Sequence, residues 1–163
     1  MQDLKTLLPN VTKLLQTQHK TITTAESCTG GLLASLLTEL PGSSSWFERG
    51  FVTYSNLSKH EMLGVDLTLI EKYGAVSSPV AQAMVQGALV QSNADVALAV
   101  TGIAGPTGGS LEKPVGTVYL AFALKDKPPK IEHYLFANKK RQEIRILTCR
   151  QAFLGILNLL TSV

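Results

Sequence analysis

Apolar residues recur every three or four positions in several segments of the chain, a spacing that places them on one face of a helix. Residues 4–15 carry six leucine or valine residues in this pattern, and Pro9 inside the segment predicts a bend. Residues 30–40 carry five leucines and stop at a Pro-Gly pair, while Ser78 followed by Pro79 is a typical helix start. The pattern predicts helices over residues 4–15, 30–40, 78–92 and 138–160, a short helix capped by Asn56, and another that ends at residues 73–74.

Short apolar or β-branched runs separate these helices and predict strands over residues 21–25, 50–55, 95–100, 115–124 and 131–136, with a turn at residues 127–130. Strands alternate with helices as far as residue 100, and then strands follow one another directly. This order predicts an α/β fold, a three-layer α/β/α sandwich with a mostly parallel central sheet that carries an antiparallel hairpin.

The composition is that of a folded protein. The 163 residues are 45% hydrophobic and 17% charged, which favours a single domain over residues 1–163 with a sizeable core. No uninterrupted apolar run approaches the roughly 18 residues of a membrane span, and residues 1–20 lack the apolar core of a signal peptide. We therefore expect a cytoplasmic protein.

Cysteine and histidine are too few and too scattered for a disulfide framework or a metal cluster. Cys28 and Cys149 lie 121 positions apart, and the three histidines are dispersed along the chain. The sequence therefore predicts a protein that uses no metal ion and no cofactor.

The net charge is only +3, but it is distributed unevenly. Residues 125–150 hold eight of the 15 basic and three of the 12 acidic residues, a local net charge of +5. Such a segment binds a phosphate or an anionic polymer, or is simply a solvated face. It lacks interleaved aromatic residues and any known nucleic-acid motif, so nucleic-acid binding ranks low among the candidate functions.

The turn at residues 25–31, Ala-Glu-Ser-Cys-Thr-Gly-Gly, lies between a predicted strand and a predicted helix. Small residues let a ligand approach the backbone, and the N–H groups at a helix start bind anions or stabilise an oxyanion. The turn presents Ser27, Cys28 and Thr29 as candidate nucleophiles. Glu26 either orients a base or caps the helix. The structural alternative is a tight turn with a capping hydroxyl group.

A second glycine-rich segment, residues 101–109, leaves another predicted strand. Four glycines in nine residues favour a close backbone approach to a ligand, or else a long flexible connection. Thr101 faces the first turn if the two strands are neighbours, and Lys113 after the loop is a candidate cation.

Two pairs of side chains add candidate chemistry. Tyr54 lies at a strand end, and Lys59 lies about one turn into the next helix. A lysine acts as a base for serine only if its pKa is depressed well below about 10.4. Arg141 and Arg145 share one face of the last helix and are able to clamp a phosphate or carboxylate. The plain alternatives are an exposed helix lysine beside a core tyrosine, and unpaired surface arginines.

These segments occur together in an order that resembles one family, the C-terminal domain of the competence-damage-inducible protein CinA, whose stand-alone members are nicotinamide-nucleotide amidases. The motifs that carry the resemblance are residues 26–31, 42–44, 47–56 with Lys59, 74–77, 101–106 with 108–109, and 113–117. They cover essentially the whole chain. The N-terminal domain of full-length CinA proteins has no counterpart in this sequence, so its functions are not expected here.

The resemblance implies hydrolysis of the carboxamide of nicotinamide mononucleotide to nicotinate mononucleotide and ammonia, by a metal-independent serine mechanism in a cytoplasmic homo-oligomer. It implies Ser27 as nucleophile and Lys59 as base, with Tyr54 assisting. The implied substrate contacts are Thr29, Gly30, Gly31, Thr101, Gly102, Arg141 and Arg145, and either an arginine or the 101–109 loop would hold the phosphate. Neither a nucleic acid nor a membrane is an expected partner. The alternative is a catalytically silent, regulatory relative linked to competence or DNA damage.

Overall fold

The computed structural model describes residues 4–162, so residues 1–3 and 163 of the predicted domain lie outside the described residues. Its centre is a five-stranded sheet with strand order β2-β1-β3-β4-β5. β1 pairs in parallel with β2 and β3, whereas β4 pairs antiparallel with β3 and β5. Four strands therefore run in one direction and β4 opposes them. The strands are β1 (Ile22–Glu26), β2 (Phe47–Val52), β3 (Val96–Gly102), β4 (Thr117–Leu124) and β5 (Lys130–Leu135).

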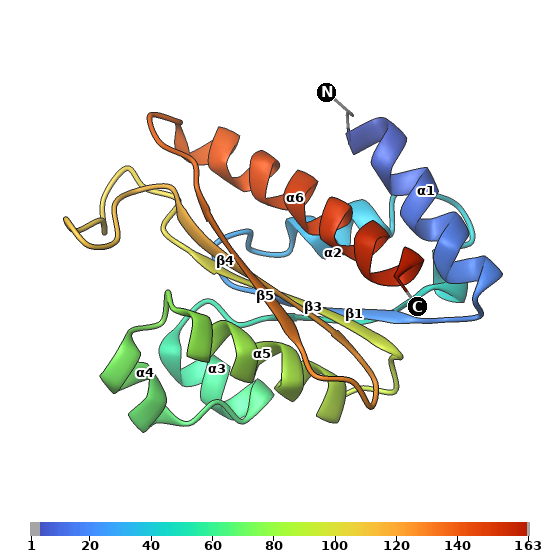
Figure 1. Cartoon of the computed structure of the whole chain (residues 1–163), viewed down its shortest axis with the longest axis horizontal. Coiled ribbons are helices and arrows are strands. Elements are labelled where there is room, and N and C mark those ends of the chain that lie inside the picture. Colours follow the sequence, from blue (N-terminus) through green and yellow to red (C-terminus); the bar gives the residue numbers. More distant parts are fainter. Residues whose placement is uncertain (1–3, 163) are drawn as a thin grey trace.

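Helices cover both faces of the sheet, which confirms the predicted three-layer α/β/α architecture. Figure 1 shows α1, α2 and α6 on one face and α3, α4 and α5 on the other. A short 3₁₀ turn, η1 (Ser43–Ser45), leads into β2. The helices are α1 (Leu4–Thr17), α2 (Leu32–Leu37), α3 (Asn56–Leu63), α4 (Leu67–Tyr73), α5 (Ser78–Val90) and α6 (Arg141–Thr161).

The two faces of the sheet have different cores. In β3, Val96, Leu98 and Val100 point into the core beneath α1, α2 and α6, because alternate residues of a strand face opposite sides. Ala97 and Ala99 point into the core beneath α5. Both faces are buried, which explains why β3 is apolar from Val96 to Val100 instead of alternating with polar residues.

Helix α6 packs closely on the sheet. By length and composition alone it is apolar enough to cross a membrane, but in this fold its buried residues contact β4 and α1. Gly155 lies against the ring of Phe122, where a Cβ atom would overlap the ring. The hydropathy of α6 is therefore accounted for by packing in the core.

Several predicted boundaries were wrong by one or a few residues. The caps are Ser55 and Ser77, not Asn56 and Ser78, since their hydroxyl groups accept the N–H groups of the third residue beyond. α2 is shorter than predicted, because Gly30 and Gly31 have positive φ angles and form the turn before the helix. β2 begins three residues early, at Phe47, which pairs with Ile22 of β1.

Candidate active site

The turn after β1 and the loop after β3 meet at the carboxyl edge of the sheet, because β1 and β3 are paired neighbours. A cavity of about 350 Å³ opens there, within the size range of small-molecule sites. Thr101 lies on this edge as predicted. The cavity is lined by Ser27, Cys28, Tyr54, Asn56, Lys59, Ala75, Val76, Thr101, Gly102, Ile103, Ala104, Gly105, Thr107, Gly108 and Arg141.

Ser27 and Lys59 are in direct contact in this cavity. The Nζ atom of Lys59 lies 3.1 Å from the Oγ atom of Ser27. It also donates to the backbone carbonyl oxygens of Thr53, at 2.8 Å, and Tyr54, at 3.3 Å. Two carbonyl groups therefore orient the amine and leave its remaining position for the serine hydroxyl, which is the arrangement required for proton exchange between them.

The amine of Lys59 is almost fully buried, with 1% of the residue exposed. Burial disfavours the ammonium form and lowers the pKa of Lys59, with a smaller opposing contribution from Cys28. The direction of this shift is the one that a lysine base requires. Burial has the opposite effect on the neighbouring thiol, since it raises the pKa of Cys28 to about 12, with a smaller contribution from the charge of Glu26. A protonated thiol is a poor nucleophile, and the amine of Lys59 contacts the hydroxyl of Ser27, so Ser27 is favoured over Cys28 as nucleophile.

Glu26 caps α2 and does not contact Lys59. Its carboxylate is fully buried and accepts the N–H groups of Gly31, Leu33 and Ala34 at 2.8–3.1 Å. The contacts decide between the two roles that the sequence left open. A negative charge at the start of a helix also has a favourable interaction with the helix dipole.

The capping carboxylate also determines which backbone N–H groups remain free near Ser27. Gly31 donates to Glu26, and Gly30 donates to the carbonyl of Ser27 at 3.0 Å. Within residues 4–162, neither the N–H of Cys28 nor that of Thr29 donates to a carbonyl or side-chain oxygen. Apart from the interaction of the Cys28 N–H with its own thiol, the free donors are therefore those immediately after Ser27, not those of the two glycines.

The two arginines of α6 contact different loops. Arg141 lines the cavity and bridges its rim, donating to the carbonyl of Gly105 at 2.8 Å and to the phenol oxygen of Tyr54 at 2.9 Å. Arg145 lies outside the lining and donates to the carbonyl of Thr29 at 2.7 Å. They do not form one clamp, although they share a helix face.

Three further predicted contacts, Thr29, Gly30 and Gly31, also lie outside the cavity lining. Thr29 is fully buried. Lys113 does not line the cavity either, and instead donates to the carbonyl of Tyr73 at 2.7 Å.

The hydroxyl of Thr101 donates to the carbonyl of Ala75 at 2.8 Å and thereby connects the segment between α4 and α5 to the cavity.

A domain model described as the CinA C-terminal domain matches residues 4–160 of this chain. The chain belongs to the CinA C-terminal domain family.

Individual relatives agree with this assignment. A nicotinamide-nucleotide amidohydrolase PncC from Enterobacter agglomerans is 52% identical over 82% of this chain and 71% of its own length. A CinA-like protein from Akkermansia muciniphila is 51% identical over 83% of this chain, but only 32% of that protein, so the chain spans about a third of it. The crystal structure of a competence/damage-inducible protein from Agrobacterium tumefaciens superposes with a TM-score of 0.92, at 44% identity and 97% coverage of both chains.

Sequence reasoning missed several residues of this CinA C-terminal domain site. Asn56, Ala75 and Val76 line the cavity, and the carbonyl of Thr53 holds Lys59. Asn56 was interpreted as a helix cap, and its place at the end of the CinA-like motif at residues 47–56 was the available signal. The tetrapeptide at residues 74–77 was among the CinA-like motifs, and that was the available signal for Ala75 and Val76.

The basic residues of segment 125–150 do not act together in the CinA C-terminal domain. Lys130 forms an ion pair with Glu132, and Lys139 with Glu143. Arg141 and Arg145 instead donate to loops around the site. The local charge of the sequence is thus divided among separate contacts.

Proposed function

We propose that the protein hydrolyses the carboxamide of nicotinamide mononucleotide to nicotinate mononucleotide and ammonia. The observation that carries the proposal is the buried contact between Ser27 and Lys59 at the edge of a 350 Å³ cavity. The name of the Enterobacter relative, a nicotinamide-nucleotide amidohydrolase, supports the choice of substrate.

In the first half of the reaction the neutral amine of Lys59 accepts the hydroxyl proton of Ser27, and Oγ attacks the carboxamide carbon. The N–H groups of Cys28 and Thr29 then donate to the oxyanion that forms. Donors of this kind contribute about 3–4 kcal/mol each to stabilising the transition state in comparable sites. The ammonium of Lys59 returns the proton to the leaving nitrogen, ammonia departs, and a nicotinyl ester remains on Ser27.

In the second half, water attacks the ester carbon and gives a proton to Lys59. The ammonium then passes this proton to Oγ of Ser27 as the acyl C–Oγ bond breaks, which restores Ser27 and the neutral amine and releases the acid. Thr53 and Tyr54 keep the amine in place through their carbonyl oxygens in both halves. Arg141 is the cation on the cavity wall and is the proposed contact for the substrate phosphate. The Tyr54 phenol assists by orienting Arg141, with which it shares a hydrogen bond.

The cytoplasmic location and homo-oligomeric state implied by the family resemblance belong to the same proposal, as does a single domain over residues 1–163. Light scattering from the purified protein measures the oligomeric state. The chemistry of the Ser27–Lys59 pair requires neither the cytoplasmic location nor the homo-oligomeric state.

The test is ammonia release from nicotinamide mononucleotide by purified protein with EDTA present, for the wild type, Ser27→Ala and Ser35→Ala. Ser35 is an exposed serine of α2, so its loss controls for the substitution itself. We expect release by the wild type and Ser35→Ala only. Release by Ser27→Ala would remove Ser27 as nucleophile, and a folded but inactive wild type would contradict the amidase function.

A further inference from the structure

Arg145 contacts the turn that carries Ser27 without reaching the cavity. Its Nη2 atom donates to the carbonyl of Thr29 at 2.7 Å, an oxygen that also accepts the N–H of Leu32 at 3.2 Å. The guanidinium therefore holds the turn from the side of α6. A contact this close to a nucleophile, yet outside the substrate cavity, points to an indirect role.

Two peptide groups connect this arginine to the N–H of Cys28, the donor beside Ser27. The carbonyl of Thr29 and the N–H of Gly30 belong to the same peptide unit, and that N–H donates to the carbonyl of Ser27 at 3.0 Å. The carbonyl of Ser27 in turn shares a peptide unit with the N–H of Cys28. Because the peptide bond is delocalised, each hydrogen bond accepted by a carbonyl polarises the N–H of its own unit.

We propose that Arg145 is a positioning residue for the oxyanion site, which orients and polarises the N–H of Cys28 through the peptide units of Thr29–Gly30 and Ser27–Cys28. The inference rests on the proposed amidase function. It assigns Arg145 a role different from the substrate contact that the sequence predicted.

The opposite side of the turn is fixed by a group of opposite charge. Glu26 accepts the N–H groups of Gly31, Leu33 and Ala34, so the carboxylate and Arg145 hold the glycine turn between them. Cooperative strengthening amounts to about 10–30% per hydrogen bond in such chains. A charged donor at the start of the chain strengthens the first bond further, because charge-assisted hydrogen bonds are about twice as strong as neutral ones.

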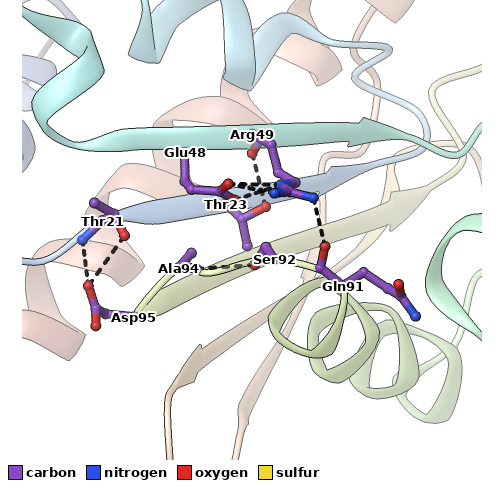
Figure 2. A network of polar contacts seen from close by, with 8 residues as sticks. All are labelled: Thr21, Thr23, Glu48, Arg49, Gln91, Ser92, Ala94 and Asp95. Carbon is purple, nitrogen blue, oxygen red and sulfur yellow. Dashed lines mark hydrogen bonds and ion pairs between the residues drawn. The ribbon is translucent and has the colours of Figure 1, made fainter.

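The kinetic test compares Arg145→Gln with Arg49→Gln. Arg49 is a matched control, because it also donates to a backbone carbonyl, that of Gln91 at 3.0 Å, but at the far end of the sheet (Figure 2). We expect Arg145→Gln to lower kcat about 10- to 100-fold and to change KM less than about threefold, since the loss of a whole oxyanion donor costs about 10²–10³-fold. Arg49→Gln should match the wild type.

Arg145→Lys separates charge from packing, because an ammonium is able to donate to the Thr29 carbonyl. We expect the kcat of Arg145→Lys to be at least about tenfold higher than that of Arg145→Gln. Equal losses for lysine and glutamine, or a raised KM with unchanged kcat, would overturn the proposal and favour direct substrate binding. If Arg145→Gln fails to fold, Arg145→Met, which also lacks a charged donor, takes its place in the comparison, and a kcat within about twofold of the wild type in that variant contradicts the proposal.

Amide NMR of the free protein tests the relay without turnover. A polarised N–H resonates downfield, so the amide protons of Cys28 and Gly30 should move upfield in Arg145→Gln and stay in place in Arg49→Gln. Unmoved signals would overturn the relay. A wild type that releases no ammonia but shows these shifts would contradict the amidase function alone, so the two failures are distinguishable.

Discussion

The two ends of β1 and β3 carry similar polar groups but use them differently. At the amino end, Thr21 donates both its N–H and its hydroxyl to the carboxylate of Asp95, at 2.8 and 3.3 Å. Nearby, Arg49 binds Glu48 through three short contacts and reaches the carbonyl of Gln91 (Figure 2). At the carboxyl end, the amine of Lys59 is buried against Ser27 beside a cavity.

The difference lies in unused capacity for hydrogen bonding and proton transfer. Around Asp95 and Arg49 the charged groups are paired or partly exposed. Asp95 joins the segments before β1 and β3, and Arg49 joins β2 to the end of α5. Lys59 is instead desolvated, its pKa is lowered, and in the described part of the chain the N–H groups of Cys28 and Thr29 donate to no carbonyl or side-chain oxygen. Catalysis is thus expected where polar groups are held in place but still have hydrogen-bonding capacity left for a substrate.

The largest effect is expected when the lysine is replaced by an apolar side chain of similar length. Lys59→Met removes the base and should reduce ammonia release at least about 10³-fold, as for other nucleophile–base pairs. Its thermal stability should equal or exceed that of the wild type, because a buried amine is desolvated. Combining it with Ser27→Ala should add little further loss. A Lys59→Met enzyme that keeps a tenth of the activity would remove Lys59 as base.

The pH dependence of the reaction tests the lowered pKa of Lys59. In the proposed mechanism the neutral amine is the active form, so kcat/KM should rise about tenfold per pH unit up to a midpoint below 10.5, the ordinary value for lysine. In the window between the lowered pKa and 10.5 the unfolded chain binds more protons, so the stability of the wild type falls as the pH decreases through it. Thermal unfolding of Lys59→Met should lack this loss. A kinetic midpoint at 10.5 would contradict desolvation.

Removing the helix cap should affect both activity and stability. Glu26→Ala leaves three N–H groups without their acceptor and should destabilise the fold by about 2–4 kcal/mol in denaturant unfolding. The same N–H groups are then free to reorient the turn, so kcat should fall about tenfold. Full activity in the folded variant would show that the turn is held without Glu26.

The smallest effect is expected at the amino end of the strands. Asp95→Ala removes the acceptor of Thr21 and should cost about 1–2 kcal/mol in denaturant unfolding, with kcat and KM unchanged. It is the counterpart of Glu26→Ala, since each carboxylate accepts backbone N–H groups at one end of β1. A fall in kcat of more than about twofold in Asp95→Ala would contradict the view that only the carboxyl ends of β1 and β3 contribute to catalysis.

Much of the fold was predictable because it depends on local periodicity. The leucine spacing of residues 4–15 and the apolar run of β3 each require burial on a definite face, whatever the neighbours are. The direct succession of β3 and β4 was enough to predict an antiparallel pair. The boundaries failed at Ser55 and Ser77, where adjacent polar residues compete for the capping position and only the packed geometry selects one.

The candidate site was predictable as a set of segments, because small residues and glycines after β1 and β3 have few purposes other than a close backbone approach. Its division of roles was not. The sequence by itself determined the order of elements, the α/β layers and the residue types near Ser27. Only the tertiary structure decided that Glu26 caps α2, that Arg141 faces the cavity while Arg145 contacts Thr29, and that Lys59 is desolvated. Those outcomes depend on distances between segments remote in sequence, which local patterns do not encode.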